Sequence, residues 1–195
     1  MVDGIANLAP VEAFLNTLDE RCFVRNGTRF AGADELANPA SLTRWLRDQE
    51  MIDRSLAATT TDLESARALR AVLRSTLERD DTTANDPAEV LRRLAVRLQV
   101  DAQGALAVAP IGTGIEGALG SLVTRVVEAR ADGSWRRLRL CASPECRWAF
   151  RDTSKAGARR WCAMASCGDR HKARARRSRS GVPIVVGREL EGRSS

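Results

Sequence analysis

The sequence predicts a mainly α-helical protein in which a helical domain with one short β-hairpin precedes a small cysteine-rich unit. In the first 133 residues, apolar side chains recur at the three- and four-residue spacing of amphipathic helices. Four of the five cysteines lie close together near the C-terminus. The charge also changes sign: residues 134–180 carry 14 Lys and Arg against 3 Asp and Glu, and residues 1–133 carry 15 against 20. We therefore expect a domain over 1–133, a basic unit over 134–180 and a tail over 181–195.

The first part of the chain predicts two short helices separated by a loop. The first helix follows Pro10, a residue suited to an opening turn, and its apolar face is Val11, Phe14, Leu15 and Leu18. Residues 25–39 are predicted to form the loop, because glycine and proline recur in them. Ser41 is then expected to cap the second helix, whose inward face is Leu42, Trp45 and Leu46.

Three longer helices follow, each with a start signal in the sequence. Thr61-x-x-Glu64 has the pattern of a capping box, and the helix it opens points four residues inward: Ala66, Leu69, Leu73 and Leu77. A second helix is predicted from Asp86, with its apolar face made of Leu91, Leu94, Ala95 and Leu98. A third should begin at Thr113 and end at Asp132-Gly133, with its apolar face made of Ile115, Leu119, Leu122 and Val126.

The one predicted hairpin lies between the second and third of these helices. Leu98 and Val100 alternate with polar residues, residues 101–104 have turn composition, and Leu106 and Val108 alternate again. This period of two is typical of paired strands.

The cysteines of the basic unit are arranged as two pairs, Cys141-x4-Cys146 and Cys162-x4-Cys167, with 15 residues between the pairs. Two close pairs of thiolates on one chain supply the four soft ligands of a tetrahedral zinc ion. Ordinary buried thiols and a redox-switched zinc site are the alternatives. The spacing favours one structural zinc ion bound by Cys141, Cys146, Cys162 and Cys167. Cys22 stands apart from them, and we assign it no chemistry.

Local patterns around these cysteines predict a strand, a knuckle, a second strand and a helix, which resembles a treble clef. Residues 138–140 alternate as a short strand before Cys141, and Pro144 favours a tight turn whose N–H groups face the sulfurs. Extended spacing continues to Asp152, and the composition becomes helical from Ala158. Cys162 and Cys167 would lie about 140° apart on an ideal helix, so this helix must start late or bend. Gly168 is suited to such a bend.

The run from Arg137 to Arg176 resembles the CGNR-type zinc finger, a family named for the tetrapeptide that starts at its last cysteine. Here that tetrapeptide is Cys167-Gly168-Asp169-Arg170, so an aspartate replaces the asparagine of the family. Other segments resemble the helical ABATE domain that precedes this finger: residues 14–17, 45–46 and 111–114. The resemblance implies a bacterial, stress-related transcription regulator whose finger binds DNA.

The residues themselves also favour a nucleic acid as partner. Within Arg159–Arg179, eight cations face one acidic residue, Asp169, and a slim basic helix there would fit a DNA groove or follow a phosphate ridge. Double-stranded DNA is therefore the predicted partner. The predicted contacts are Arg159, Arg160, Arg170, Lys172, Arg174, Arg176 and Arg177.

Other readings of the basic unit remain open. It could be a zinc-stabilised module for protein interaction, including docking on the acidic body of the same chain. It could also bind RNA, with Trp148, Phe150 and Trp161 stacking on bases, although such aromatic residues more often form a small core around the metal. A solvated charged helix is the plainest alternative.

An enzyme is not expected. His171 is the only histidine, and a zinc ion with four cysteine ligands has no position for an activated water. No apolar run is long enough to span a bilayer and no signal peptide is recognised, so we expect a cytoplasmic, nucleoid-associated protein. The helical body could form a homodimer or enclose a small effector. Asn16 and Arg21 could line such a pocket, although a polar contact to buried backbone is the commoner role of a residue like Asn16.

Overall fold

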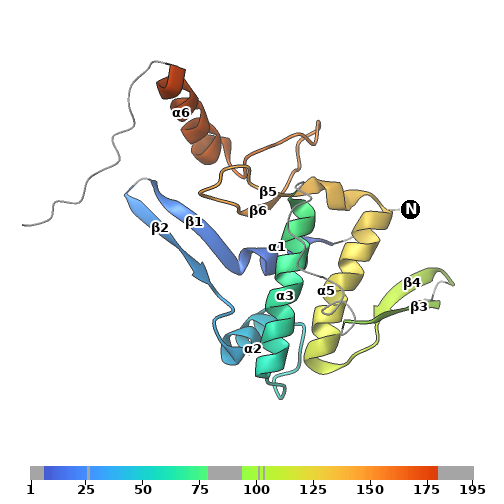
Figure 1. The fold of residues 1–195 in the computed structure, drawn as a ribbon. Helices are drawn as coiled ribbons and strands as arrows, with labels where there is room; N and C mark the ends of the chain where they lie inside the picture. Colours follow the sequence, from blue (N-terminus) through green and yellow to red (C-terminus); the bar gives the residue numbers. More distant parts are fainter. Residues whose placement is uncertain (1–6, 26, 79–93, 101, 103, 180–195) are drawn as a thin grey trace, which may run out of the picture.

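The computed structural model describes residues 7–179 apart from residues 26, 79–93, 101 and 103 (Figure 1). The elements of the body are α1 (Ala9–Asn16), β1 (Leu18–Arg25), β2 (Thr28–Asp34), α2 (Pro39–Asp48), α3 (Thr60–Leu77), β3 (Val96–Val100), β4 (Leu106–Pro110) and α5 (Gly114–Ala131). The finger comprises the 3-10 turn η1 (Ser134–Arg137), β5 (Leu138–Leu140), β6 (Ala149–Arg151), the π turn η2 (Met164–Gly168) and α6 (Asp169–Arg179).

The prediction of a mainly α-helical fold with one hairpin is wrong. The described part of the chain contains three two-stranded antiparallel sheets, β1–β2, β3–β4 and β5–β6, beside the helices. The fold is therefore mixed, with helices and small hairpins that alternate along the chain. Only β3–β4 lies where the sequence predicted the hairpin of the body.

The β1–β2 hairpin replaces the end of the first predicted helix and the predicted loop over residues 25–39. Helix α1 stops at Asn16, so Leu18 belongs to β1 and not to a helical face. Arg25 pairs with Thr28, so the two strands are joined by a short connection. Gly27 has a φ of 77°, a conformation that glycine adopts without steric cost. The Asn-Gly dipeptide is a strong hairpin signal, and it should have predicted these strands.

Helices α1, α2, α3 and α5 share one hydrophobic core. The predicted inward residues of α2 are buried, as are Ala66, Leu69 and Leu73 of α3, while Leu77 is half-buried. All four predicted apolar positions of α5 are buried as well. Helices α3 and α5 lie side by side in the middle of the body (Figure 1). Helical periodicity therefore identified most of this core correctly.

The start of each helix differs from the prediction in detail. Helix α2 is capped by Asn38, and Ser41 is the third helical residue, which closes the capping box. Helix α3 is capped by the pair Thr59 and Asp62, two residues before the predicted Thr61 and Glu64. Both motifs match the capping-box pattern only loosely, because Ser and Asp replace the usual Glu or Gln at the third position. Thr113 is the N-cap residue of α5, as predicted, without a side-chain capping bond.

The helix predicted from Asp86 lies outside the described residues as far as position 93. Leu94 is buried in the core, while Leu98 belongs to strand β3 and is 73% exposed. The prediction that Leu98 lies on a helical face is therefore wrong.

The hydrophobic core continues past Gly133, the predicted domain boundary. Gly133 has the left-handed conformation expected where α5 ends, with φ of 76°. Beyond it, Trp135, Leu138 and Ala149 belong to the same buried cluster as α1, α3 and α5. The body and the start of the finger are thus packed together.

Among the described residues, none of the helices combines the length and the hydropathy of a membrane span.

Candidate metal centre

The first cysteine pair lies on a tight knuckle that joins β5 to β6. Leu138 is buried in the core and fixes β5, so that Cys141 follows directly at its end. The backbone N–H of Cys141 donates to the carbonyl of Trp148 at 2.9 Å, and that of Cys146 donates to the carbonyl of Ser143 at 2.9 Å. These bonds close the loop, as the sequence predicted, and bring Cys146 back beside Cys141.

The second pair spans the start of the last helix. Cys162 lies in an irregular segment, and Cys167 lies in the π turn η2 that leads into α6. The predicted helix start at Ala158 is therefore wrong, while the expectation that the helix starts late is confirmed. A Cβ atom at Gly168 would come within 2.7 Å of the Met164 sulfur and 3.3 Å of Trp161. A larger residue at position 168 would displace the end of the Met164 side chain, and the π turn itself provides the bend.

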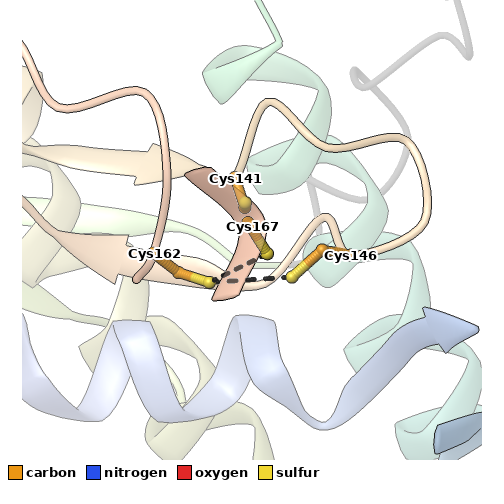
Figure 2. A group of neighbouring side chains, drawn as sticks. All are labelled: Cys141, Cys146, Cys162 and Cys167. Atoms are coloured by element: carbon orange, nitrogen blue, oxygen red, sulfur yellow. Dashed lines mark hydrogen bonds between the residues drawn. The ribbon is translucent and has the colours of Figure 1, made fainter. Parts of the chain in front are cut away.

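The four sulfur atoms converge on one point (Figure 2). All four lie within 4.8 Å of one another, and the Sγ atom of Cys162 is 3.7 Å from that of Cys146 and 3.8 Å from that of Cys167. Ligands about 2.3 Å from a tetrahedral zinc ion would be about 3.8 Å apart. The cluster therefore has the ligand type, the number and the spacing of a single zinc site.

Hydrogen bonds within the cluster shift the pKa values of the thiols in opposite directions. The pKa of Cys141 is lowered to about 2, mainly by hydrogen bonds from the thiols of Cys146 and Cys162. Backbone hydrogen bonds from Cys162 and Ser143 lower it further. The hydrogen bond with Cys141 raises the pKa of Cys162 to about 12, and the same kind of bond raises the pKa of Cys146. Four crowded thiols cannot all ionise by themselves. A divalent cation at their centre would remove this conflict and make all four thiolates favourable ligands.

A second layer of residues surrounds the cysteines. One guanidinium nitrogen of Arg170 lies 3.2 Å from the Sγ atom of Cys167, and the guanidinium carbon lies 3.4 Å from the centre of the Phe23 ring. Phe23, on β1, packs against the cysteine cluster together with Trp148 and Trp161. The N-terminal hairpin, which the sequence prediction missed, is thus part of the wall around the metal site.

Two backbone contacts join the finger to the body. The N–H of Cys22 on β1 donates to the carbonyl of Glu145 in the knuckle at 2.9 Å. The Asn16 side chain donates to the carbonyl of Ala149 at 3.0 Å and accepts from its N–H at 2.8 Å. Asn16 therefore satisfies a buried backbone, the plainer of its two predicted roles. Arg21 packs over the Trp148 ring at 4.1 Å and donates a hydrogen bond to Asp19.

A charged network also holds the knuckle against α3. Arg147, between Cys146 and Trp148, has a φ of 51°, which is unusual for a residue with a side chain. Its carbonyl accepts a hydrogen bond from Arg74 at 3.0 Å, and its guanidinium pairs with Glu78. Arg74 is buried and pairs with Glu20 as well, and burial lowers its pKa to about 10. Long-range contacts of this kind leave no local signal in the sequence.

The loop between the cysteine pairs is organised by Asp152. This buried carboxylate accepts from the hydroxyl of Ser154 at 2.6 Å and from the N–H groups of Ser154 and Arg159 at 2.9 Å and 2.8 Å. The Ser154 hydroxyl bond is the main reason that the pKa of Asp152 falls to about 2. These hydrogen bonds fix the conformation of the segment that precedes Cys162.

The structure divides the predicted nucleic-acid contacts into two groups. Three are engaged within the protein: Arg170 on Cys167 and Phe23, Arg174 on Glu145, and Arg159, which donates to the carbonyl of Cys162 at 2.8 Å. The others are exposed to solvent: Arg160, Lys172, Arg176 and Arg177. Lys172 makes only a loose pair with Asp169, at 3.8 Å. Arg160 also lies over the Trp161 ring, with its guanidinium carbon 5.2 Å from the ring centre.

The aromatic residues of the finger form its small core. Phe150 is buried with Cys141, Cys146 and Cys167, and Trp148 and Trp161 pack against this cluster. Trp161 also lies beside the ring of His171, with ring centres 4.8 Å apart. This placement agrees with the structural role predicted for these aromatics and does not favour base stacking by them.

Residues 137–180 match the family model of the CGNR zinc finger. The match covers the four clustered cysteines and α6. A comparison with curated proteins gave no match for the chain. The finger and its metal-binding cysteines are thus identified, whereas the resemblance of the N-terminal body to an ABATE domain stays a prediction.

Proposed function

We propose that this protein is a DNA-binding regulator in which one structural zinc ion fixes a basic recognition helix. The observation that carries the proposal is the position of α6. None of its eleven residues is buried, yet its N-terminal end continues directly from the π turn that holds Cys167. The helix projects from the rest of the molecule (Figure 1). A helix that has no buried residue and is anchored at one end is suited to an external partner.

The charge of α6 supports a polyanion as the partner. Six of its residues are Arg or Lys and one is acidic. Arg170 and Arg174 turn back onto the finger, so the outer surface is formed by Lys172, Arg176, Arg177 and Arg179. Cations on a narrow helix neutralise phosphates and release counterions, which gives binding that weakens steeply with salt. Because the aromatic residues are engaged in packing, double-stranded DNA fits this surface better than unpaired RNA.

A structural role for the zinc follows from its ligands. Four cysteines complete a tetrahedral coordination shell and leave no open position for water or substrate. We accordingly propose that the finger does no catalysis and that the metal stabilises the fold. The alternative, a zinc-stabilised protein-interaction module, would need an acidic partner surface and would not prefer a duplex.

Fluorescence anisotropy with the zinc-loaded full-length protein tests DNA binding. We expect a 30-base-pair duplex to bind more tightly than polyglutamate at moderate salt. The double variant Lys172→Gln/Arg177→Gln should reduce the slope of log K against log salt by about 2, since each lost phosphate contact contributes about 0.9. Arg44→Gln/Arg54→Gln, which removes two exposed arginines of the body, is the matched control and should bind like the wild type.

Equal binding of the duplex and polyglutamate would contradict the proposal, as would wild-type affinity of the α6 variant. A double-stranded RNA of the same length separates the two nucleic acids. Enrichment of particular genomic fragments on the protein, lost in the α6 variant, is the result expected of a regulator. Uniform recovery of fragments would contradict a regulatory role.

A further inference from the structure

A cavity of about 420 Å³ lies where the end of α3 meets the finger, outside the metal site. Thr76 and Leu77 of α3 form one side, and η1 and β5 form another. Ala142, next to Cys141, and Arg160, two residues before Cys162, complete the lining. The N–H of Ala142 donates to the carbonyl of Arg160 at 2.9 Å, so this wall of the cavity is held together by the finger itself.

Four arginines and no acidic residue line this cavity: Arg136, Arg139, Arg159 and Arg160. In the described part of the chain, neither Arg136 nor Arg160 forms an ion pair. Arg139 donates to the carbonyl of Gly157 at 2.6 Å, and its Nε atom lies 3.9 Å from the carboxylate of Asp152. That Nε atom is buried and has no hydrogen-bond partner. The lining of the cavity therefore has an excess of positive charge.

Apart from Thr76, the rest of the lining is apolar. Trp135 and Leu138 are buried, and Leu77 and Leu140 are half-buried. Guanidinium groups bind carboxylates and phosphates through paired hydrogen bonds, and an apolar wall binds the hydrocarbon part of a ligand. The volume falls in the range of small-molecule sites, about 300 to 1,000 Å³. A duplex would bring phosphates to the rim of the cavity but nothing to fill its apolar part.

We propose that this cavity binds a small organic anion, consisting of an aromatic or short aliphatic group with one carboxylate or phosphate. The charged group lies among Arg136, Arg139 and Arg160, and the hydrocarbon part lies against Trp135 and Leu138. The site uses residues of both the body and the finger, so an occupant contacts α3 and both cysteine-bearing segments at once.

Isothermal titration calorimetry on the zinc-loaded full-length protein tests this site with four probes. Phenyl phosphate and benzoate combine both features of the proposed ligand, whereas inorganic phosphate lacks the hydrocarbon and benzyl alcohol lacks the charge. We expect Kd values of about 1 mM or lower for the first two, and at least about tenfold weaker binding for the others. Inorganic phosphate binding as tightly as phenyl phosphate would overturn the proposal and assign the cavity to simple anions or nucleic-acid phosphates.

Variants locate the binding. Arg136→Gln/Arg160→Gln should weaken phenyl phosphate binding by about tenfold or more, and the matched Arg44→Gln/Arg54→Gln control should leave it unchanged. Both double variants change exposed residues, so the fold is retained. Absence of measurable heat for both organic anions at about 10 mM, or equal affinity in the two double variants, would refute the site. Duplex binding is measured in a separate assay with variants of α6. Failure of the cavity to bind organic anions would therefore not contradict DNA binding, and failure to bind DNA would not contradict the anion site.

Discussion

The side-chain amide of Asn16 pairs with both backbone polar groups of Ala149. Asn16 is the last residue of α1, and Ala149 is the first residue of β6, in the finger. The amide accepts from the N–H at 2.8 Å and donates to the carbonyl at 3.0 Å. Ala149 is fully buried, so its backbone groups depend on these bonds rather than on solvent. These two hydrogen bonds join the finger to the body.

Asn16→Ala should destabilise the whole protein. The substitution leaves a buried N–H and a buried carbonyl without partners, which costs about 2 to 3 kcal/mol of unfolding free energy. Urea unfolding followed by circular dichroism measures this loss. Gln99→Ala, which removes an exposed amide on β3, is the control and should change the midpoint little. A midpoint for Asn16→Ala equal to that of the control would mean that the Ala149 contacts do not stabilise the junction.

Cys162→Ala should lower the bound zinc well below one ion per chain. Cys162 lies within 3.8 Å of the sulfurs of both Cys146 and Cys167, so its loss opens the coordination shell. Elemental analysis of purified, reduced protein gives the stoichiometry. Cys22→Ala removes the exposed fifth cysteine and should retain the wild-type zinc content. Full metal content in Cys162→Ala would show that the ligands are assigned wrongly.

Metal removal should destabilise the body together with the finger. Leu138 and Ala149, which border the cysteine knuckle, lie in the same core as α1, α3 and α5. At free zinc about 1,000-fold above its Kd, the ion contributes about 4 kcal/mol of stability. Chelation should therefore lower the melting temperature by about 10 °C. The amide protons of α3 should also exchange faster in the chelated protein. Unchanged exchange in α3 would show that the body folds independently of the finger.

The sequence identified those parts of the molecule that depend on local pattern or on residue type. The faces of α2, α3 and α5 follow from a period of 3.6 residues, and the metal ligands follow from cysteine spacing. The β1–β2 hairpin was missed because β1 carries polar residues at positions such as Glu20 and Arg21, which conceal the alternation of a strand. Its one clear signal in the sequence was the Asn26-Gly27 dipeptide.

Residues that join the finger to the body could not be predicted from the sequence. Arg74 and Arg147 are distant in the chain, and their contact exists only because α3 and the knuckle share a core. Phe23 reaches the cysteines for the same reason, since β1 lies against the finger. Among the predicted DNA contacts, sequence position alone could not separate Arg170, which packs on Phe23, from the exposed Arg177.

The pair formed by Arg70 and Asp34 should make stability depend on pH. Arg70 is buried and donates to both carboxylate oxygens, at 2.8 Å and 2.7 Å. These bonds hold the pKa of Asp34 below its ordinary value. Because the folded pKa is the lower one, the pair stabilises the protein above the ordinary carboxyl range. That contribution is lost as the pH falls through the lowered pKa.

Asp34→Asn tests this pair without interference from the metal. At pH 7 the variant should be about 2 to 3 kcal/mol less stable than the wild type, because the buried Arg70 loses its counter-charge. The difference should shrink as the pH falls below about 5, because Asp34 of the wild type then becomes protonated, first in the unfolded chain and at lower pH in the folded protein. Acid also releases zinc, but from both proteins equally, so this effect cancels in the difference. Urea unfolding at each pH provides the values, with the exposed Asp53→Asn as control. A difference that stays constant across this range would show that the Asp34 charge does not stabilise the fold.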